Sequence, residues 1–348
     1  MAATKRLMHT VMHLERNHSI MPTNDVGEIC VVYAIRQNDG IESFIRFIES
    51  CERFPMSISS QPKLVVAVKE STVDFESQIR NYAEERKQNI CLIRVPDWGS
   101  AFGSWRTIIE NETNDLYVLL TATSKATRDY WVDSLTQGFI DPEVGIIASM
   151  CSSESIRDTY RFAQLLRIKL FLRIRLSNYE ADIADIFKLR TSTEMKSEPI
   201  YIKSSYFLNF LSSQLRNIVL FLTKSRGDWS WKRTFPKSPN IHFRTTGFAI
   251  RGETYRKIMK SLPIDKAENL ALETGHNSFT RQVEKFGLKV KIFSSTDGLV
   301  DLRSQSAHRT FRWIGGDSIV VDAHSNEFAS FSLRRQLSLQ ILSHGNIY

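Results

Sequence analysis

The stretch Ile29-Cys-Val-Val-Tyr-Ala-Ile35 decides the fold class of this sequence. It is a continuous run of apolar, largely β-branched residues, which is typical of a strand buried on both faces of a sheet. Residues 41–53 (IESFIRFIESCER) follow with apolar side chains at helical spacing. A buried strand followed by an amphipathic helix is the unit from which parallel sheets are built.

The same alternation continues along the chain. Further strands are predicted at Leu64-Val-Val-Ala-Val68, 89–95, 116–120, 247–250 and 288–293, and further helices at 74–87 and 100–110. Strand–helix alternation implies right-handed crossovers and a mostly parallel sheet covered by helices. The expected fold class is therefore α/β with a Rossmann-like central sheet, whose ligands lie at the carboxyl ends of the strands.

The rhythm breaks in the middle of the chain, which suggests an insertion. We expect an N-terminal extension (1–28) followed by one domain over 29–348. The predicted parts of that domain are a nucleotide-binding half (29–156), a helical insertion of basic and apolar residues (157–226) with an apolar helix at 205–223, and an acceptor-side half with the C-terminal segment (227–348).

Composition and charge narrow the class of protein. Of the 348 residues, 42% are apolar and 24% charged, which is ordinary for a soluble globular protein. The net charge of +8 suggests an anionic partner such as a nucleotide diphosphate or an acidic lipid surface. We expect no nucleic-acid partner, because no helix-turn-helix, RRM or zinc pattern occurs. The four cysteines are scattered, which favours buried thiols in a reducing compartment.

The sequence predicts a cytoplasmic protein. It has no apolar signal-peptide core near the N-terminus and no run of about 20 apolar residues. Residues 165–176 (LLRIKLFLRIRL) leave three interpretations open. Their alternation suits a strand, their basic character suits a helix lying on anionic lipid, and a plain helix packed on the core explains them equally. The second interpretation implies peripheral association with the inner face of a membrane.

Two segments carry the residues expected to hold phosphate. Residues 95–105 read Val-Pro-Asp97-Trp-Gly99-Ser-Ala-Phe-Gly-Ser-Trp. We expect Asp97 to cap the following helix and Gly99 to allow backbone amides to approach a phosphate closely. An ordinary Pro-Asp-x-Gly turn explains the same residues.

The second segment is the strand ending in Thr121-Ala122-Thr123-Ser124. A hard divalent ion prefers carboxylate oxygens, so Mg²⁺ or Mn²⁺ is not supported by these hydroxyl groups. Hydroxyls can hydrogen-bond a phosphate without neutralising it, so basic residues must offset the charge. Lys125 and Arg128, which directly follow this segment, are candidates for this role, and the family resemblance described next adds His242 and Arg244.

Taken in order, these segments resemble glycosyltransferase family 2 and its GT-A relatives. The family usually carries Asp-x-Asp where this chain has Thr-Ala-Thr, but a bacterial subset with Asn-Ser-His-Ser also lacks it. Phe235-Pro-Lys-Ser-Pro-Asn-Ile-His-Phe-Arg-Thr-Thr-Gly-Phe248 resembles that subset's Phe-Pro-Asn-Pro-His-x-Arg-Thr-Asn-x-Phe. Leu272-Glu-Thr-Gly-His-Asn-Ser-Phe-Thr-Arg281 is similar to Phe-Glu-Ser-Gly-Arg-x-Ser-x-Thr-Arg, with Thr274 and His276 as departures. Residues 308–312 are similar to a Ser-x-Thr-Phe-Arg element of the subset.

The resemblance implies a GT-A fold and transfer of a sugar, with inversion, from a nucleotide-diphosphate donor to a glycan or lipid-linked acceptor in bacterial surface polysaccharide synthesis. Glu273 is the implied general base, with Asp265 behind it. The implied donor-binding residues are Arg36, Asp97, Gly99, Thr121, Thr123, His242 and Arg244, and the acceptor-side residues are Gly275, His276 and Arg281. Two alternatives stay open: Glu273 caps a helix or pairs with Arg281, and the whole chain is an inactive GT-A domain that binds nucleotide, glycan or a partner.

Overall fold

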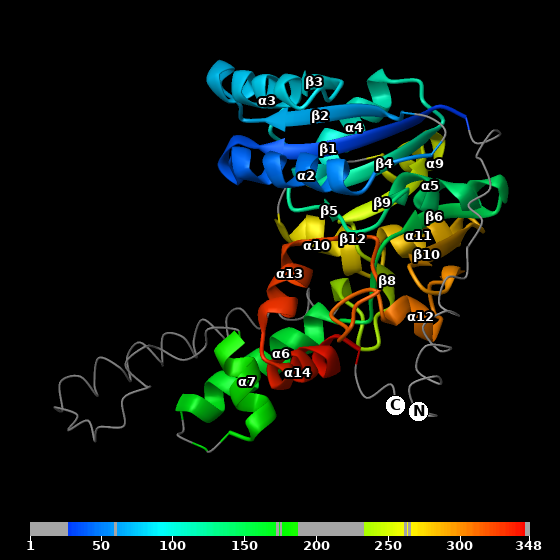
Figure 1. Ribbon diagram of the computed structural model, residues 1–348. Coiled ribbons are helices and arrows are strands. Elements are labelled where there is room, and N and C mark those ends of the chain that lie inside the picture. Colours follow the sequence, from blue (N-terminus) through cyan, green and yellow to red (C-terminus); the bar gives the residue numbers. More distant parts are fainter. Residues whose placement is uncertain are drawn as a thin grey trace, which may run out of the picture.

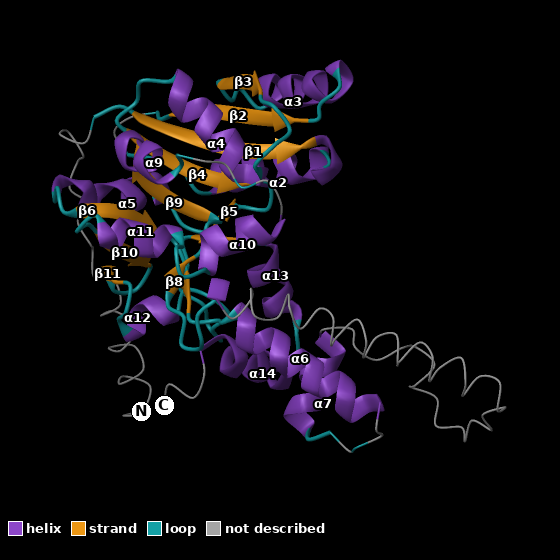
Figure 2. Ribbon diagram, turned by 180° about the vertical axis from the view of Figure 1, so that it is seen from behind, coloured by secondary structure: helices purple, strands orange, loops and turns teal. Residues whose placement is uncertain are grey.

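A mixed sheet of eight strands forms the centre of the molecule (Figures 1 and 2). The computed structural model describes residues 27–58, 61–171, 174, 176–186, 233–260, 263 and 266–344. The strand order is β11-β10-β6-β9-β4-β1-β2-β3. The strands are β1 (Ile29–Arg36), β2 (Lys63–Lys69), β3 (Ile90–Arg94), β4 (Leu116–Thr121), β6 (Val144–Ala148), β9 (Gly247–Arg251), β10 (Lys289–Ser294) and β11 (Gly298–Asp301).

Most strands of the sheet run in one direction, as the sequence predicts. β1 pairs in parallel with β2 and β4, β2 with β3, and β6 with β10. β9 lies antiparallel between β4 and β6, and β11 is antiparallel at the edge. Strands from before and after the helical segment at 156–186 therefore belong to one sheet. The mostly parallel α/β architecture is confirmed.

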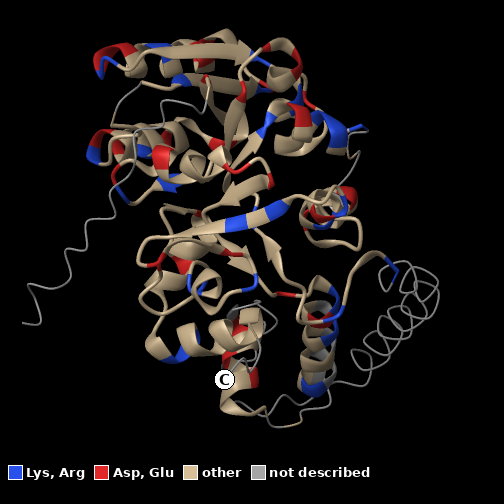
Figure 3. Ribbon diagram, turned by 90° about the vertical axis from the view of Figure 1, so that its right-hand side faces the viewer, with Lys and Arg blue, Asp and Glu red and all other residues tan. Residues whose placement is uncertain are grey.

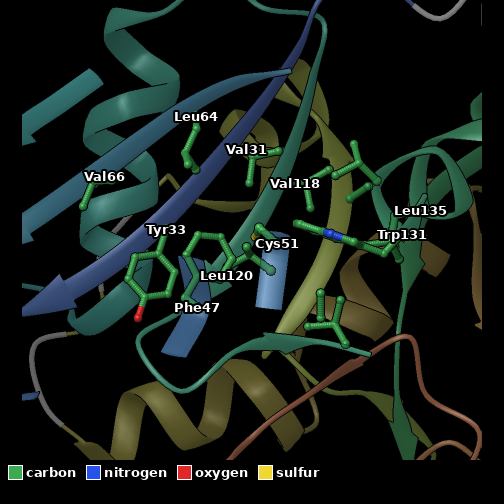
Figure 4. Packing of buried hydrophobic residues seen from close by; sticks show 14 of the residues in the cluster. Val31, Tyr33, Phe47, Cys51, Leu64, Val66, Val118, Leu120, Trp131 and Leu135 are labelled. Carbon is green, nitrogen blue, oxygen red and sulfur yellow. The ribbon is translucent and has the colours of Figure 1, made fainter. Parts of the chain in front are cut away.

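Helices cover both faces of the sheet. One face is covered by α2 (Ile41–Arg53), α3 (Val73–Glu85) and α5 (Trp131–Thr136), and the other by α4 (Ser100–Asn111), α9 (Gly252–Ile258) and α11 (Phe279–Lys285). Alternate residues of β1 point to opposite faces, so its apolar run supplies both core layers. Figure 4 shows the first layer, in which the Tyr33 and Phe47 rings stack with centroids 4.3 Å apart. Burying one such side chain contributes about 1.5–3 kcal/mol.

A second group of helices lies beyond the sheet (Figure 1). It consists of α6 (Ile156–Phe171), α7 (Asn178–Ile186), α13 (Ala323–Ser330) and α14 (Leu333–His344). Leu166 of α6 is buried against Phe328 and Leu339, with Phe162 and Leu170 packed beside it. The spacing of four residues places these three α6 side chains on one side of the helix.

The structure excludes one of the three interpretations of residues 165–176. The chain is helical through Phe171, so the strand interpretation is wrong. The apolar side of α6 packs on other helices, and this burial favours a helix over the strand that the alternating pattern suggests. Lys169 forms an ion pair with Glu180. Arg173, Arg175 and the helix expected at 205–223 lie outside the described residues.

In the part of the chain that the structure describes, no helix has both the length and the apolar character needed to cross a membrane.

Cys30, Cys51 and Cys151 are buried free thiols, as predicted, whereas Cys91 is only partly buried. Figure 3 shows Lys and Arg interspersed with Asp and Glu over the visible face.

Short elements connect the sheet to the C-terminal residues. β5 (Lys125–Ala126) pairs antiparallel with β12 (Val320–Val321), and β7 (Cys151–Ser152) with β8 (His242–Phe243). The remaining elements are η1 (Gln37–Asp39), η2 (Gln137–Ile140), α10 (Lys266–Thr274) and α12 (Gln305–His308). The β5–β12 pair places residues near 320 directly beside the chain that leaves β4.

Candidate functional site

The topology of the sheet points to one place for a ligand. From β1 the chain moves outward to β2 and β3, whereas after β4 it moves to the opposite side of the sheet. β1 and β4 are nevertheless neighbours. Ligands of open α/β sheets bind outside the carboxyl ends of the strands at such a switch point. In this protein that edge carries Arg36 at the end of β1 and Thr121 at the end of β4.

Hydroxyl groups line the end of β4 and are held in place by hydrogen bonds. Tyr33 Oη donates to the carbonyl of Ala122 at 2.8 Å, and the amide of Thr121 donates to Ser124 Oγ at 3.0 Å. Ser124 Oγ in turn donates to the carbonyl of Thr246 at 2.5 Å. The Thr121 and Thr123 hydroxyls lie 3.4 Å apart. These bonds join the end of β4 to the segment that follows Arg244.

This set of donors does not fit a divalent cation. The side chains at the end of β4 offer neutral hydroxyls, where Mg²⁺ and Mn²⁺ prefer carboxylates. A carboxylate that contacts the same segment, Asp322, already accepts hydrogen bonds from Arg244, Thr246 and Ser325. Among the described residues there is no group of three or more His, Cys, Asp and Glu side chains that could hold a metal.

On the β1 side of the edge, Arg36 and Asp97 form an ion pair with Nη2 and Oδ1 3.5 Å apart. The expectation that Asp97 caps α4 is wrong. Gly99 occupies the N-cap position with φ of 67°, and no side chain caps the helix. The left-handed conformation, which glycine adopts without strain, turns the chain at Gly99, and Asp97 lies two residues before this N-cap.

Lys69 holds the loop between Asp97 and Ser100 in place, and the sequence analysis did not identify it. Its side chain is buried, and Nζ donates to the carbonyls of Trp98, at 2.8 Å, and of Ser100. Burial, followed by the charge of Arg36, lowers the pKa of Lys69 to about 8. Gly103 packs under the same loop, where a Cβ would lie 2.0 Å from the Trp98 carbonyl oxygen. A lysine ending an apolar strand is the signal that could have revealed this arrangement.

On the other side of the edge, residues 240–247 run antiparallel to residues 149–153. The amide of Asn240 donates to the carbonyl of Ser153, and that of Arg244 to the carbonyl of Met150, both at 2.9 Å. His242 lies inside this ladder, with Nδ1 2.7 Å from the Asn240 carbonyl oxygen. Burial lowers the pKa of His242 to about 4, so the ring is neutral at pH 7 and offers no positive charge to a phosphate.

Arg244 is held by a buried carboxylate. Its Nη2 donates to Asp322 Oδ2 at 3.2 Å, and Thr246 Oγ1 donates to the same oxygen at 3.1 Å. Asp322 also caps α13 by accepting from the Ser325 amide at 2.8 Å. Burial raises the pKa of Asp322, but Arg244 and Ser325 outweigh it, so the pKa lies below its usual value. The sequence reasoning missed Asp322, although a carboxylate directly after the apolar run 319–321 was a usable signal.

Glu273 lies in the last turn of α10 and faces this same segment. Thr245 Oγ1 donates to Glu273 Oε1 at 3.0 Å. Burial raises the pKa of Glu273, while Arg244 and the Thr245 hydroxyl act in the opposite direction. Arg281, the alternative partner, donates instead to Asn240 Oδ1 at 3.4 Å. Thr245 thus binds Glu273, while the next residue, Thr246, binds Asp322 and accepts a hydrogen bond from Ser124 at the end of β4.

The other predicted residues lie further away or outside the description. Gly275 and His276 line a cavity of about 410 Å³ between α9, α10 and α11, which Glu273 does not line. Arg128 donates to the carbonyl of Ser295, and Lys125 is exposed on β5. Asp265 lies outside the described residues. The structure therefore brings Thr121, Thr123, Arg244 and Glu273 into one connected set of contacts.

Comparisons with known proteins add little to this description. No protein-family model matches the sequence, and no curated protein does. Among solved structures, CMP:2-keto-3-deoxy-manno-octonic acid synthetase complexed with CTP is 12% identical, with a TM-score of 0.38, covering 76% of this chain and 89% of that one. GalNAc-T7 with UDP, GalNAc and Mn²⁺ is 12% identical, with a TM-score of 0.29, covering 35% of this chain and 22% of that one.

A mannosyltransferase from Pyrobaculum calidifontis in complex with GDP-Man and Mn²⁺ is 18% identical, with a TM-score of 0.28, covering 40% of this chain and 39% of that one. All three of these structures contain a nucleotide or a nucleotide sugar, according to their descriptions. Likeness of this degree assigns no role to any residue of the present chain.

Proposed function

We propose that this protein is a glycosyltransferase that moves a sugar from a nucleotide-diphosphate donor to a hydroxyl of a glycan or lipid-linked acceptor, with inversion, in surface polysaccharide synthesis. The observation that carries the proposal is the position of Glu273. This carboxylate, whose pKa is raised by burial, is joined through Thr245 and Thr246 to the end of β4 at the switch point of the sheet. A general base is most effective when its pKa is close to the working pH.

The chemistry assigns one step to Glu273. The acceptor hydroxyl oxygen attacks the anomeric carbon and forms the new glycosidic bond, while the bond from that carbon to the diphosphate oxygen breaks. The electron pair of the broken bond leaves with the diphosphate, and the hydroxyl proton passes to Glu273. Thr121 and Thr123 donate hydrogen bonds to the phosphate oxygens, and Arg36 with Asp97 lies where a nucleoside at the β1 end of the edge would contact them.

The test is turnover on a panel of nucleotide sugars, with diphosphate release as the readout and a bacterial lipid extract as acceptor. We expect Glu273→Gln to lower kcat by about 10²–10⁴-fold, because the proton acceptor is lost. Glu253→Gln, the same chemical change at an exposed side chain, is the matched control and leaves kcat unchanged. The acid limb of the kcat–pH profile is expected above the usual carboxylate range, since burial raises the pKa of Glu273.

The hydroxyl groups at the end of β4 favour a second candidate, an inactive domain that binds nucleotide or glycan, or serves as a partner subunit. Nucleotide binding without turnover across the panel supports this candidate and contradicts the first. Wild-type activity in Glu273→Gln contradicts the role of Glu273.

A lipid-linked acceptor belongs in the panel because the basic and apolar residues 165–176, which begin in α6, suit a membrane surface. Leu165 is 45% exposed and Ile174 is 49% exposed, whereas Leu166 is buried in the helical group. The exposed side chains are the ones available to lipid. Sedimentation with anionic liposomes at low salt tests this part, and protein that stays in the supernatant contradicts it.

A further inference from the structure

The segment Phe311-Arg312 lies against Arg244 and places two guanidinium groups around one aromatic ring. Arg244 Cζ is 4.0 Å from the centroid of the Phe311 ring, and Arg312 Cζ is 5.0 Å from it. Each arginine also faces one carboxylate. Arg244 donates to Asp322 at 3.2 Å, and Arg312 approaches both oxygens of Glu154 at 3.5 Å. Two cations from distant parts of the sequence thus share one small volume.

Both arginines have unused hydrogen-bonding capacity. The Nε atoms of Arg244 and Arg312 are buried and have no hydrogen-bond partner within the described part of the chain. A buried donor without a partner costs about 1–3 kcal/mol. Both side chains are nevertheless partly exposed, at 21% for Arg244 and 15% for Arg312. An anion with several oxygens could satisfy donors that the protein itself leaves unpaired.

The backbone of Arg312 is held in an unfavourable conformation. Its φ is 46°, in the left-handed region that a residue with a Cβ rarely adopts and that costs of the order of 1 kcal/mol. Contacts on both sides maintain it: Phe311 O lies 2.7 Å from His344 Nε2, and Arg312 Nη1 donates to Ser343 Oγ at 3.3 Å. The amide of Cys151 donates to Thr310 Oγ1 at 3.0 Å. The fold therefore fixes the direction of the Arg312 side chain at an energetic cost.

The location connects this pair to the end of β4. Arg244 lies two residues before Thr246, whose carbonyl accepts from Ser124, and it lowers the pKa of Glu273 by its charge. We infer that Arg244 and Arg312, arranged around Phe311, bind the diphosphate of the donor in place of a divalent cation. This inference rests on the proposed function for the donor, and it explains how a site with hydroxyls at the end of β4 offsets the leaving group's charge.

The assignment follows from the geometry of the groups. A guanidinium can donate two parallel hydrogen bonds to a phosphate, which an ammonium cannot do. The oxygens of a diphosphate would accept hydrogen bonds from both arginines. When no ligand is bound, the negative charges of Asp322 and Glu154 reduce the repulsion between the two guanidinium groups. The neutral ring of His242 takes no part in offsetting the charge.

The test is calorimetric titration of the full chain with inorganic pyrophosphate, UDP, GDP and UMP, each in EDTA and in Mn²⁺. We expect the diphosphates to bind in EDTA and more tightly than UMP. Arg312→Lys keeps the charge and its attraction to Glu154 but loses the paired donors, so we expect affinity for the diphosphates to fall about tenfold. Arg312→Gln and Arg244→Lys are expected to lose at least as much.

Arg309→Gln is the matched control, because Arg309 is an exposed arginine of the same segment, and its diphosphate affinity is expected to equal that of the wild type. Thermal unfolding of each variant shows whether it is folded. Diphosphate binding that requires Mn²⁺, or that is the same in Arg312→Lys and Arg312→Gln as in the wild type, overturns the inference. So does the absence of any diphosphate binding, or an equal loss in Arg309→Gln.

Turnover measured on the same samples separates the inference from the proposed function. Diphosphate binding that depends on Arg312, without sugar transfer to any acceptor, supports the arginine pair and contradicts the transferase. Turnover that EDTA abolishes and that Arg312 variants retain supports the transferase and overturns the arginine pair. Turnover that is indifferent to EDTA and lost in Arg312→Lys supports both.

Discussion

The Arg36–Asp97 and Arg244–Asp322 ion pairs lie at the same edge of the sheet in very different surroundings. The side chains of the first pair are 43% and 37% exposed, and those of the second are 21% and 4% exposed. Exposed ion pairs contribute little because water already solvates both charges. A largely buried charge that loses its partner has little water to take the place of the counter-ion. Loss of a charge should therefore alter stability little at the Arg36–Asp97 side of the edge and strongly at the Arg244–Asp322 side.

Breaking the buried pair gives the largest expected change in stability. Asp322→Asn keeps the shape of the side chain but leaves the Arg244 charge without its counter-ion, and we expect it to lower the free energy of unfolding by about 3 kcal/mol. Urea unfolding followed by circular dichroism measures the difference. A loss below about 1 kcal/mol would show that the pair behaves as an exposed one.

Low pH tests the contribution of His344, which contacts the carbonyl of Phe311 beside the arginine pair. Burial lowers the pKa of His344 to about 4 from 6.5, with Phe311 acting in the opposite direction. The unfolded chain therefore binds more protons than the folded one between these values. The stability from the neutral ring is fully present above about pH 6.5 and is lost as the pH falls toward 4, by about 3 kcal/mol.

The variant that checks this is His344→Gln, in which an amide donor to the Phe311 carbonyl replaces the imidazole. We expect its free energy of unfolding to fall less steeply between pH 6.5 and 4 than that of the wild type. His242, whose pKa is also lowered to about 4, continues to contribute in both proteins. Equal pH dependence in the two proteins contradicts the assignment to His344.

The smallest change is expected at the exposed pair. Asp97→Asn removes the partner of Arg36, where both side chains reach water, so the free energy of unfolding should change by less than about 1 kcal/mol. Unfolding in urea, side by side with Asp322→Asn, makes the comparison direct. A loss as large as that of Asp322→Asn would remove the distinction between the two sides of the edge.

The two sides of the edge also differ in how far the sequence predicts them. The predicted strands and helices between residues 29 and 121 agree with the structure to within about two residues. Continuous apolar runs predict the strands that are buried on both faces, and apolar residues at helical spacing predict the helices that cover them. The roles of Glu273 and Arg244 are predicted only from a resemblance of short segments. Lys69 and Asp322 were missed, since nothing in their immediate sequence shows which backbone groups or cations lie opposite them.

The sequence alone determined the class of the sheet and the hydroxyl character of the β4 end. These features depend on residue type and on neighbours a few positions apart. The tertiary structure decided the antiparallel placement of β9, the neutral state of His242 and the meeting of Arg244 with Phe311, Arg312 and Asp322. Each of these depends on burial or on contacts between distant segments, because a charge takes its effect from what surrounds it in space.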